Sequence, residues 1–187
     1  MKLSDYAIEL IEMLSTELEA RGGKAYFGEV YNYRSGEYET TLLNGMTVED
    51  ICLITGAEIT AGACSQVFVL PEVVIKWAKP NNIHNSDAEN DARVYERARA
   101  MGMEAYVAQT ERVGFLTLQE RILPAAEVSN DMPWDLYFER VKEVGGLAEA
   151  LGLGDMHDSN WGFRPDDVNF TTPVMFDFSC ARENPNY

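Results

Sequence analysis

The sequence contains little of what a disulfide-stapled or zinc-binding protein requires. Its 187 residues include 3 cysteines and 2 histidines. The cysteines (Cys52, Cys64 and Cys180) are odd in number and lack the spacing of metal ligands. A disulfide framework and a zinc site are therefore not expected, and this cysteine usage suits a reducing cytoplasm. We expect a cytoplasmic protein.

Basic residues are also scarce, since 15 Lys and Arg stand against 31 Asp and Glu, for a formal net charge of −16. A nucleic-acid-binding protein would need a basic surface to offset phosphate repulsion, so no nucleic-acid partner is expected. The acidic residues are spread along the chain, and their usual effect is to keep a protein soluble. An alternative is that the protein is an acidic decoy, which occupies a basic site on another protein. The opening segment MKLSDYAIELIEML has acids among its apolar residues, so we expect neither a signal peptide nor a membrane span.

Hydrophobic periodicity and turn residues predict an α+β fold. Ser4 is placed to cap a first helix, and Thr47 with Asp50 resembles a capping box for a second. Ser86 and Glu89 are spaced as a capping box for a third helix. The expected elements are a helix over 4–21, a hairpin over 24–43, a helix from 47 to near 56, strands over 59–61, 66–70 and 73–78, a helix over 86–100, strands near 105–112 and 115–121, a polar stretch after Pro124, a helix over 133–151, and a loop leading to a closing strand pair that ends at VMFDFS.

The loop GLGDMHDSNWGF contains Asp155 and Asn160, five residues apart on a segment too rich in Gly, His and Asp for a helix. On its own this spacing is most often a solvated turn. The apolar strand that follows, however, delivers Asp177 at its end. Mg²⁺ prefers oxygen ligands, with one or two carboxylates completed by phosphates and water. Asn160 and Asp177 can supply such oxygens, which leaves Asp155 to accept a proton from an attacking hydroxyl.

Lys76 ends the apolar run Val73-Val74-Ile75 and follows the turn Gly62-Ala63-Cys64-Ser65 by one strand. Strand lysines are usually exposed charges. Here the period-two pattern places Lys76 on the face of Val74, where its ammonium and the N–H groups of the turn can address phosphates. A buried ammonium needs an acidic partner. The next helix offers Glu89, Asp91 and Glu96.

Six short segments of the sequence, taken in their order along the chain, resemble the protein-kinase-like superfamily. The matching segments are AGACSQVFVL for the glycine-rich loop, VVIKWA for the strand lysine, SDAENDARVYERA for the helix acid, LTLQERI for the hinge, GDMHDSNWGF for the catalytic loop and VMFDFS for the metal aspartate. The family has these parts in the same order. The catalytic loop and FDFS are the most specific of the six segments. The six segments together span roughly residues 57–180.

The resemblance implies a role for each matching residue, with ATP and Mg²⁺ as cofactors. Gly62 and Ser65 would belong to the phosphate-gripping loop, and Lys76 would hold the α- and β-phosphates. Its ion-pair partner would be Glu89, with Asp91 as the rival because the helix register is open. The remaining assignments are backbone groups of Glu120 to Ile122 for adenine, Asp155 as catalytic base, and Asn160 and Asp177 as metal ligands. His157, two residues after Asp155, is similar to the histidine of aminoglycoside- and choline-kinase-like enzymes.

The chain departs from the family pattern at several positions. Leu153 stands where relatives usually carry histidine, only Gly62 remains in the glycine-rich loop, and Ser179 replaces the usual glycine of Asp-Phe-Gly. Ten residues follow Asp177, which leaves no room for an activation segment or for acceptor-binding helices. This compact form is similar to short kinase-like proteins of tailed bacteriophages, and a viral protein of this kind would act in the host cytoplasm.

The resemblance implies a two-lobed fold with a minimal C-terminal lobe. Residues 1–56 would be an N-terminal helix and hairpin extension packed on the N-terminal lobe. Residues 57–122 would form that lobe, and residues 123–187 a truncated C-terminal lobe containing the catalytic loop. Trp77 and Trp161, although next to two site residues, are expected in the core.

Three interpretations of function follow. The first is a phosphotransferase that moves the γ-phosphoryl group of ATP to a hydroxyl on a protein, such as a host protein, or on a small molecule. The second is a non-catalytic binding protein, either a pseudokinase or an acidic inhibitor of a host protein. The third is an α+β domain in which the kinase-like string is accidental, which the family order of six segments disfavours.

Overall fold

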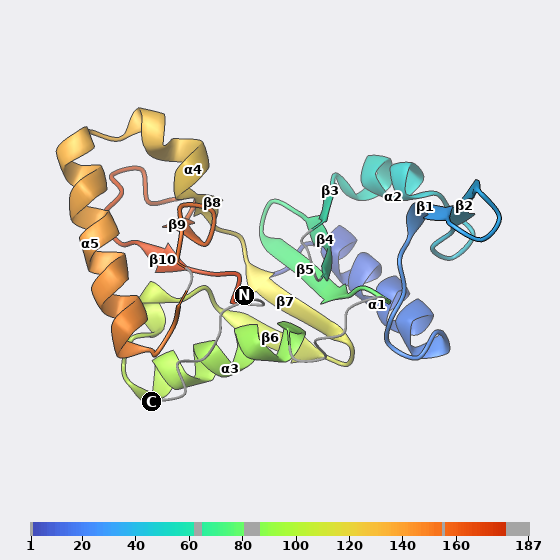
Figure 1. Cartoon of the computed structure of the whole chain (residues 1–187), viewed down its shortest axis with the longest axis horizontal. Coiled ribbons are helices and arrows are strands. Elements are labelled where there is room, and N and C mark those ends of the chain that lie inside the picture. Colours follow the sequence, from blue (N-terminus) through green and yellow to red (C-terminus); the bar gives the residue numbers. More distant parts are fainter. Residues whose placement is uncertain (1, 62–64, 81–86, 155, 179–187) are drawn as a thin grey trace. The chain divides into compact units, whose positions relative to one another are not determined.

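A computed structural model describes residues 2–61, 65–80, 87–154 and 156–178. The predicted α+β class is confirmed: helices and antiparallel strand pairs alternate along the chain (Figure 1). The chain forms two compact units. The first comprises residues 1–88 and 111–119, and the second comprises residues 89–110 and 120–187. Each unit has its own cluster of buried apolar side chains.

The two helices of the first unit begin and end where the sequence predicts. In α1 (Asp5–Ala20) the Ser4 hydroxyl accepts the Ala7 N–H at 3.3 Å. In α2 (Val48–Thr55) Thr47 and Asp50 form a reciprocal capping box, and Gly56 ends the helix with φ of 69°. The cap predicted for the third helix involves Ser86, which lies outside the described residues.

The strands of the first unit form a hairpin and a five-stranded sheet. The hairpin pairs β1 (Gly28–Asn32) with β2 (Glu37–Thr41). The sheet has the order β3-β4-β5-β7-β6. Its strands are β3 (Glu58–Ala61), β4 (Ser65–Val69), β5 (Val73–Ala78), β6 (Thr110–Val113) and β7 (Leu116–Glu120).

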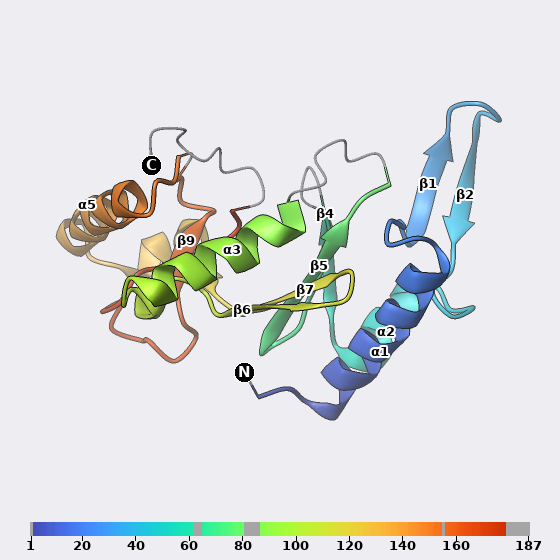
Figure 2. The same cartoon turned by 90° about the horizontal axis from the view of Figure 1, so that it is seen from below.

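The core of the first unit joins the amphipathic face of α1 to one face of this sheet. Leu10, Leu14 and Leu18 of α1 are fully buried with Phe68 and Trp77 of the sheet. The helices α1 and α2 lie side by side (Figure 2). Burial of several large side chains, at about 1.5–3 kcal/mol each, is what makes the helix and the sheet one unit.

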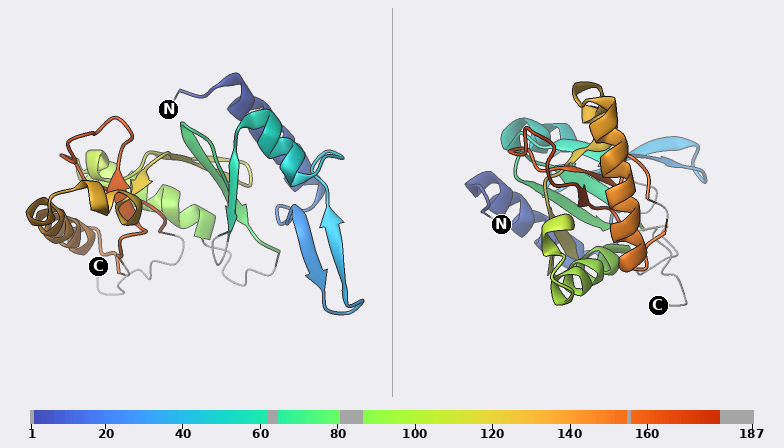
Figure 3. Two further views of the ribbon diagram at one scale, coloured as in Figure 1. Left: turned by 90° about the horizontal axis from the view of Figure 1, so that it is seen from above. Right: turned by 90° about the vertical axis from the view of Figure 1, so that its left-hand side faces the viewer.

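The second unit combines helices with a small antiparallel sheet of order β10-β9-β8. Gly162 in the central strand packs so closely on β8 that an added Cβ would overlap the Leu123 carbonyl. Figure 3 shows α4 near β9 and α5 as a long helix of this unit. Its elements are α3 (Asp87–Ala100), η1 (Glu104–Tyr106), β8 (Leu123–Pro124), α4 (Ala125–Val128), η2 (Ser129–Asp131), α5 (Trp134–Ala150), β9 (Trp161–Phe163) and β10 (Val174–Met175).

One local prediction was wrong and another was incomplete. The strand expected near 105–112 begins only at Thr110, because residues 104–106 form the 3₁₀ turn η1 and Ala108 donates its N–H to the Met175 carbonyl at 2.9 Å. The polar stretch after Pro124 contains the short helices α4 and η2. Trp77 and Trp161, in contrast, are 0% and 2% exposed, which confirms them as core residues.

Among the described residues, no helix combines the length and the apolar character that crossing a membrane would require.

Candidate functional site

The part of the predicted catalytic loop that the structure describes is a hydrogen-bonded turn. Asp155 itself lies outside the described residues. The Asn160 N–H donates to the His157 carbonyl at 2.8 Å, and the Ser159 N–H donates to His157 Nδ1 at 3.3 Å. These bonds fold residues 157–160 back on themselves, so Asn160 is held at the entrance to β9.

The turn is tied to two helices of its unit through Asp158. The Asp158 carbonyl accepts the Ala126 N–H of α4 at 3.1 Å, and its carboxylate accepts the Tyr137 hydroxyl of α5 at 2.6 Å. This hydrogen bond to the carboxylate, together with burial and the nearby negative charge, raises the pKa of Tyr137 to about 12. Tyr137 therefore remains a neutral donor to Asp158 throughout the physiological pH range.

Asn160 and Asp177 are brought to the same end of the small sheet. In the antiparallel pairing of β9 with β10, Trp161 lies opposite Met175. One step beyond this pair, the Phe176 N–H donates to the Asn160 carbonyl at 2.9 Å. The two residues predicted as metal ligands thus lie just beyond the ends of two paired strands, Asn160 before β9 and Asp177 after β10, with Asp177 directly after the residue that bonds to Asn160.

Asp177 has a backbone conformation that few residues other than glycine adopt. Its φ is 58°, in the left-handed region, and its side chain is half-buried. The next residue, Phe178, donates its N–H to Asp91 Oδ1 at 2.6 Å. Hydrogen bonds on both sides therefore hold Asp177 in a conformation that costs on the order of 1 kcal/mol. Strained residues of this kind cluster at functional sites, which makes Asp177 a candidate independently of any motif.

Asp91, weighed as the partner of Lys76, has its carboxylate bound to the Phe178 N–H and is only 1% exposed. Sequence reasoning missed this role. The sequence signal that could have revealed this role is the helical spacing of Asp91, Val94 and Ala98, which puts them on one face of α3, where all three are buried. A carboxylate on an apolar helix face needs a hydrogen-bond donor. Glu89 lies in the first turn of α3, and nothing described bears on its side chain.

Lys76 lies in β5 of the first unit, opposite Val67 of β4. The side chains of Val73, Ile75 and Trp77 belong to the apolar core of this unit, so alternation places Lys76 on the opposite face, as predicted. Lys76 is nevertheless only 6% exposed. Burial to this extent is unusual for a lysine and sets it apart from an ordinary surface charge.

Of the residues predicted for the phosphate-gripping loop, Gly62 lies outside the described residues. Ser65 begins β4, pairs with Ala78 and is 6% exposed.

The residues predicted to bind adenine occupy the end of β7 and the segment after it. The Glu120 N–H donates to the Gln109 carbonyl at 2.8 Å, so adenine recognition would fall to the other backbone groups of residues 120–122. The Glu120 carboxylate accepts two bonds from Arg164, at 2.7 and 3.2 Å, and Arg164 also donates to the Ala105 carbonyl. This bidentate clamp, which sequence reasoning missed, fixes the segment. Ile122 is 5% exposed and packs among apolar residues.

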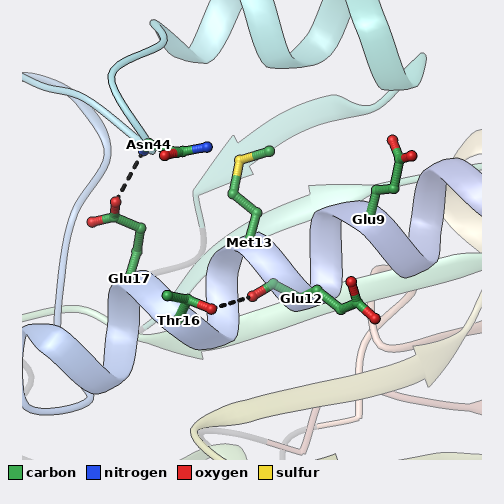
Figure 4. A pocket seen from close by; sticks show the side chains of 6 residues that line it. All are labelled: Glu9, Glu12, Met13, Thr16, Glu17 and Asn44. Carbon is green, nitrogen blue, oxygen red and sulfur yellow. Dashed lines mark hydrogen bonds between the residues drawn. The ribbon is translucent and has the colours of Figure 1, made fainter.

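Two hollows on the surface of the first unit contain none of the predicted site residues. One, of about 370 Å³, is lined by residues of α1 and by Asn44 (Figure 4). In it, Glu17 accepts the Asn44 N–H at 3.2 Å and Thr16 donates to the Glu12 carbonyl. The other, of about 790 Å³, lies beside β1 and β2 and mixes tyrosines with charges of both signs. Neither brings together the groups that phosphoryl transfer requires.

The two residues at the end of the small sheet, Asn160 and Asp177, carry oxygen donors of the kind that a hard cation binds together with water and phosphate ligands. Within the described residues, no three His, Cys, Asp or Glu side chains gather as a cation site. An all-protein metal cage is thus not found in that part of the chain. One carboxylate and one amide oxygen, from Asp177 and Asn160, are the kind of partial set that Mg²⁺ accepts when a nucleotide supplies further oxygens.

Neither a protein-family model nor a curated protein shows a significant match to this chain.

Proposed function

We propose that this chain is a phosphotransferase of protein-kinase-like, two-lobed fold, which uses ATP with Mg²⁺ and transfers the γ-phosphoryl group to a hydroxyl acceptor. The observation that carries the proposal is the placement of Asn160 and Asp177 just beyond the adjacent ends of β9 and β10, with Asp177 held at φ of 58° by bonds on both sides. The kinase-like order of the sequence segments and the buried Lys76 support it.

In this proposal each residue has a defined task. Asn160 and Asp177 would hold Mg²⁺, which, when bound, neutralises the charge on the phosphates. Lys76 would bind the phosphates as a point charge. Asp155 would accept the proton of the attacking hydroxyl as its oxygen bonds to the γ-phosphorus and the bond to the β-phosphate oxygen breaks, releasing ADP.

The first test is the thermal stability of the protein with ATP alone, Mg²⁺ alone and both together. At about a hundred times its dissociation constant, a ligand stabilises by roughly 2.7 kcal/mol. That corresponds to several degrees in Tm, at roughly 2–4 °C per kcal/mol for a chain of this size. We expect a shift that requires both components and is lost in Asp177→Ala and Asn160→Ala.

Asp166→Ala provides the matched control, because Asp166 is an exposed aspartate of the same unit outside the proposed site. It should keep the full shift. No shift in the wild-type protein under any condition would contradict a nucleotide site. A shift of equal size in wild type and Asp177→Ala would contradict the metal assignment.

The second test is transfer of labelled phosphate from ATP to water, to small hydroxyl compounds and to proteins of a bacterial lysate. Activity that is present in the wild-type protein and absent in Asp155→Ala supports the catalytic base. Nucleotide binding without any transfer would favour the alternative, a non-catalytic binding protein, for which the exposed apolar side chains of α5 are the motivating observation.

A further inference from the structure

The outer face of α5 carries an unusual row of exposed apolar side chains. Trp134, Phe138 and Val141 are 73%, 55% and 38% exposed. At 3.6 residues per turn, positions 134, 138, 141 and 145 fall within roughly 60° of one another around the helix. These four residues, Trp134, Phe138, Val141 and Gly145, are called the α5 stripe below.

The aromatic end of the α5 stripe is ordered by its neighbours. The rings of Trp134 and Phe138 stack with centroids 6.0 Å apart, and Tyr137 packs edge-on against both. Tyr137 is itself anchored by its bond to Asp158 and by contact with the buried Trp161. Rigid aromatic side chains lose little conformational entropy on binding, which is why such residues dominate the energetics of interfaces.

The glycine end of the stripe provides an independent observation. Gly145 and Gly146 lie in the middle of α5, where each costs about 1 kcal/mol relative to alanine. Neither has a positive φ, and a Cβ added to either would meet no atom within 4 Å. Packing within the described structure therefore gives no reason for glycine here. Close approach of another backbone would give one at Gly145, which is aligned with the aromatic residues.

Charge favours one class of occupant. The exposed flank of the stripe carries Asp135, Glu139 and Glu149 against Lys142, and Glu139 is 3.8 Å from Arg140, so acidic groups still outnumber basic ones there. With a net charge of −16, a second copy of the chain would be repelled, and so would an anionic membrane surface. A basic helix would instead gain attraction along this flank while its apolar face covers the stripe.

We propose that the α5 stripe is a docking surface for a basic amphipathic α-helix of another protein, with Trp134 and Phe138 as anchors and Gly145 as the point of closest backbone approach. None of the four residues of the α5 stripe is among those assigned to the nucleotide.

The probe is a synthetic peptide of about five helical turns with leucines on one face and Lys or Arg elsewhere, and with no Trp or Tyr. Trp77 and Trp161 are buried, so Trp134 is the tryptophan that reports on the surface. Docking should shift its emission to shorter wavelength and protect it from acrylamide. A peptide with Glu in place of each basic residue should bind at least about tenfold more weakly, a difference of roughly 1.4 kcal/mol.

Two matched variants separate docking from nonspecific attraction. Gly145→Leu blocks the close approach and should weaken binding about tenfold or more, whereas Gly146→Leu, about 100° further round the helix on its charged flank, should weaken it much less. Both replace glycine by a better helix former, so both should be at least as stable as the wild type, which controls for folding. Asp177→Ala should bind the peptide normally, so failure here and failure of the proposed function are distinguishable.

Several outcomes would overturn the proposal. Equal binding of the basic and acidic peptides would exclude charge complementarity, and normal binding by Gly145→Leu would exclude the surface. A concentration-dependent dimer in sedimentation, lost in Gly145→Leu, would assign the α5 stripe to a second copy. The same emission shift with phosphatidylcholine vesicles, without a response to the peptide, would assign it to a lipid surface.

Discussion

At the scale of single residues, Asp177 joins two properties that usually conflict. Its left-handed backbone would be satisfied best by glycine, yet the proposed function requires its carboxylate. A residue that keeps a strained conformation because its side chain is needed should be replaceable with a gain in stability and a loss of function.

Asp177→Gly tests this conflict. We expect glycine to relieve about 0.5–1 kcal/mol of backbone strain in the free energy of unfolding without nucleotide, because it adopts φ of 58° without a Cβ penalty. The stabilisation by ATP with Mg²⁺ should disappear. Urea denaturation measures the first effect. Asn44→Gly is the control, since Asn44 has φ of 49° in an exposed turn that asparagine tolerates, and its change should be within a few tenths of a kcal/mol. A less stable Asp177→Gly protein would show that the carboxylate supports the fold.

Asp167 gives a pH-dependent prediction. Burial of its carboxyl raises the pKa, but hydrogen bonds from the Thr171 and Thr172 N–H groups and the Thr171 hydroxyl outweigh this and lower it below 3.8. A pKa that is lower in the folded than in the unfolded state contributes stability above the unfolded pKa, and this stability is lost as the pH falls through the folded pKa.

Asp167→Asn should therefore be about 1–2 kcal/mol less stable than wild type at pH 7. The gap should shrink as the pH falls below about 4. Denaturation with urea across pH 3 to 7 measures it. Asp166→Asn, at the exposed neighbouring aspartate, should show no comparable gap. A stability difference between wild type and Asp167→Asn that does not change with pH would mean that the hydrogen bonds from the two threonines do not depend on the charge of Asp167.

At the scale of elements, the segment before β1 joins its unit through side chains instead of a strand ladder. The Gln66 amide of β4 accepts the Phe27 N–H at 2.8 Å and donates to the Phe27 carbonyl at 2.6 Å. The Trp77 indole donates to the Ala25 carbonyl at 2.8 Å. Gln66 is 1% exposed, so its amide substitutes for a missing strand neighbour of Phe27.

Gln66→Leu should destabilise the protein by about 2–4 kcal/mol, because it leaves two buried backbone groups without partners while keeping the side-chain volume. Gln66→Glu retains an acceptor but no donor and should also lose stability. Hydrogen exchange should show faster opening at residues 25–30 than at α1. Protection of these residues equal to that in the wild type would contradict the role of the Gln66 bridge.

The sequence predicted correctly those helices and strands whose apolar side chains recur at one regular spacing. The apolar residues of α1 recur at helical spacing and the cap at Ser4 is local, so both could be found without any tertiary information. The strand expected near 105–112 failed because residues 107 and 108 pair with Met175, a partner that the local pattern does not specify.

The candidate site divides in the same way. That Asn160 and Asp177 lie near each other could be expected, because one follows a loop and the other follows a strand end. The bond from Phe178 to Asp91 joins residues 87 positions apart and could not be predicted from spacing. Nor could the left-handed backbone of Asp177, since it depends on bonds made by the residues on either side. The functional roles of all the predicted site residues, Glu89 and Asp155 included, stay predictions.

At the scale of the whole molecule, the excess of acidic residues sets an energetic condition. A net charge of −16 in 187 residues favours expanded states through self-repulsion, which salt screens. We expect the free energy of unfolding in urea at pH 7 to rise by about 0.5–1 kcal/mol between low salt and 0.3 M NaCl. Near pH 4.4, the sequence pI, the salt effect should vanish. Stability that falls with salt at pH 7 would instead show that attractive ion pairs dominate.

The division of the chain has a consequence for biosynthesis. The first unit is completed only by residues 111–119, and β7, which lies in that segment except for its last residue, is between β5 and β6 in the sheet. A ribosome elongating at about 5–20 residues per second must therefore synthesise residues 89–110 of the other unit before this sheet can close. For a period on the order of seconds, β5 lacks one neighbour and offers an unpaired edge to other chains. The nascent protein should be most prone to aggregation, and most dependent on chaperones, in that interval.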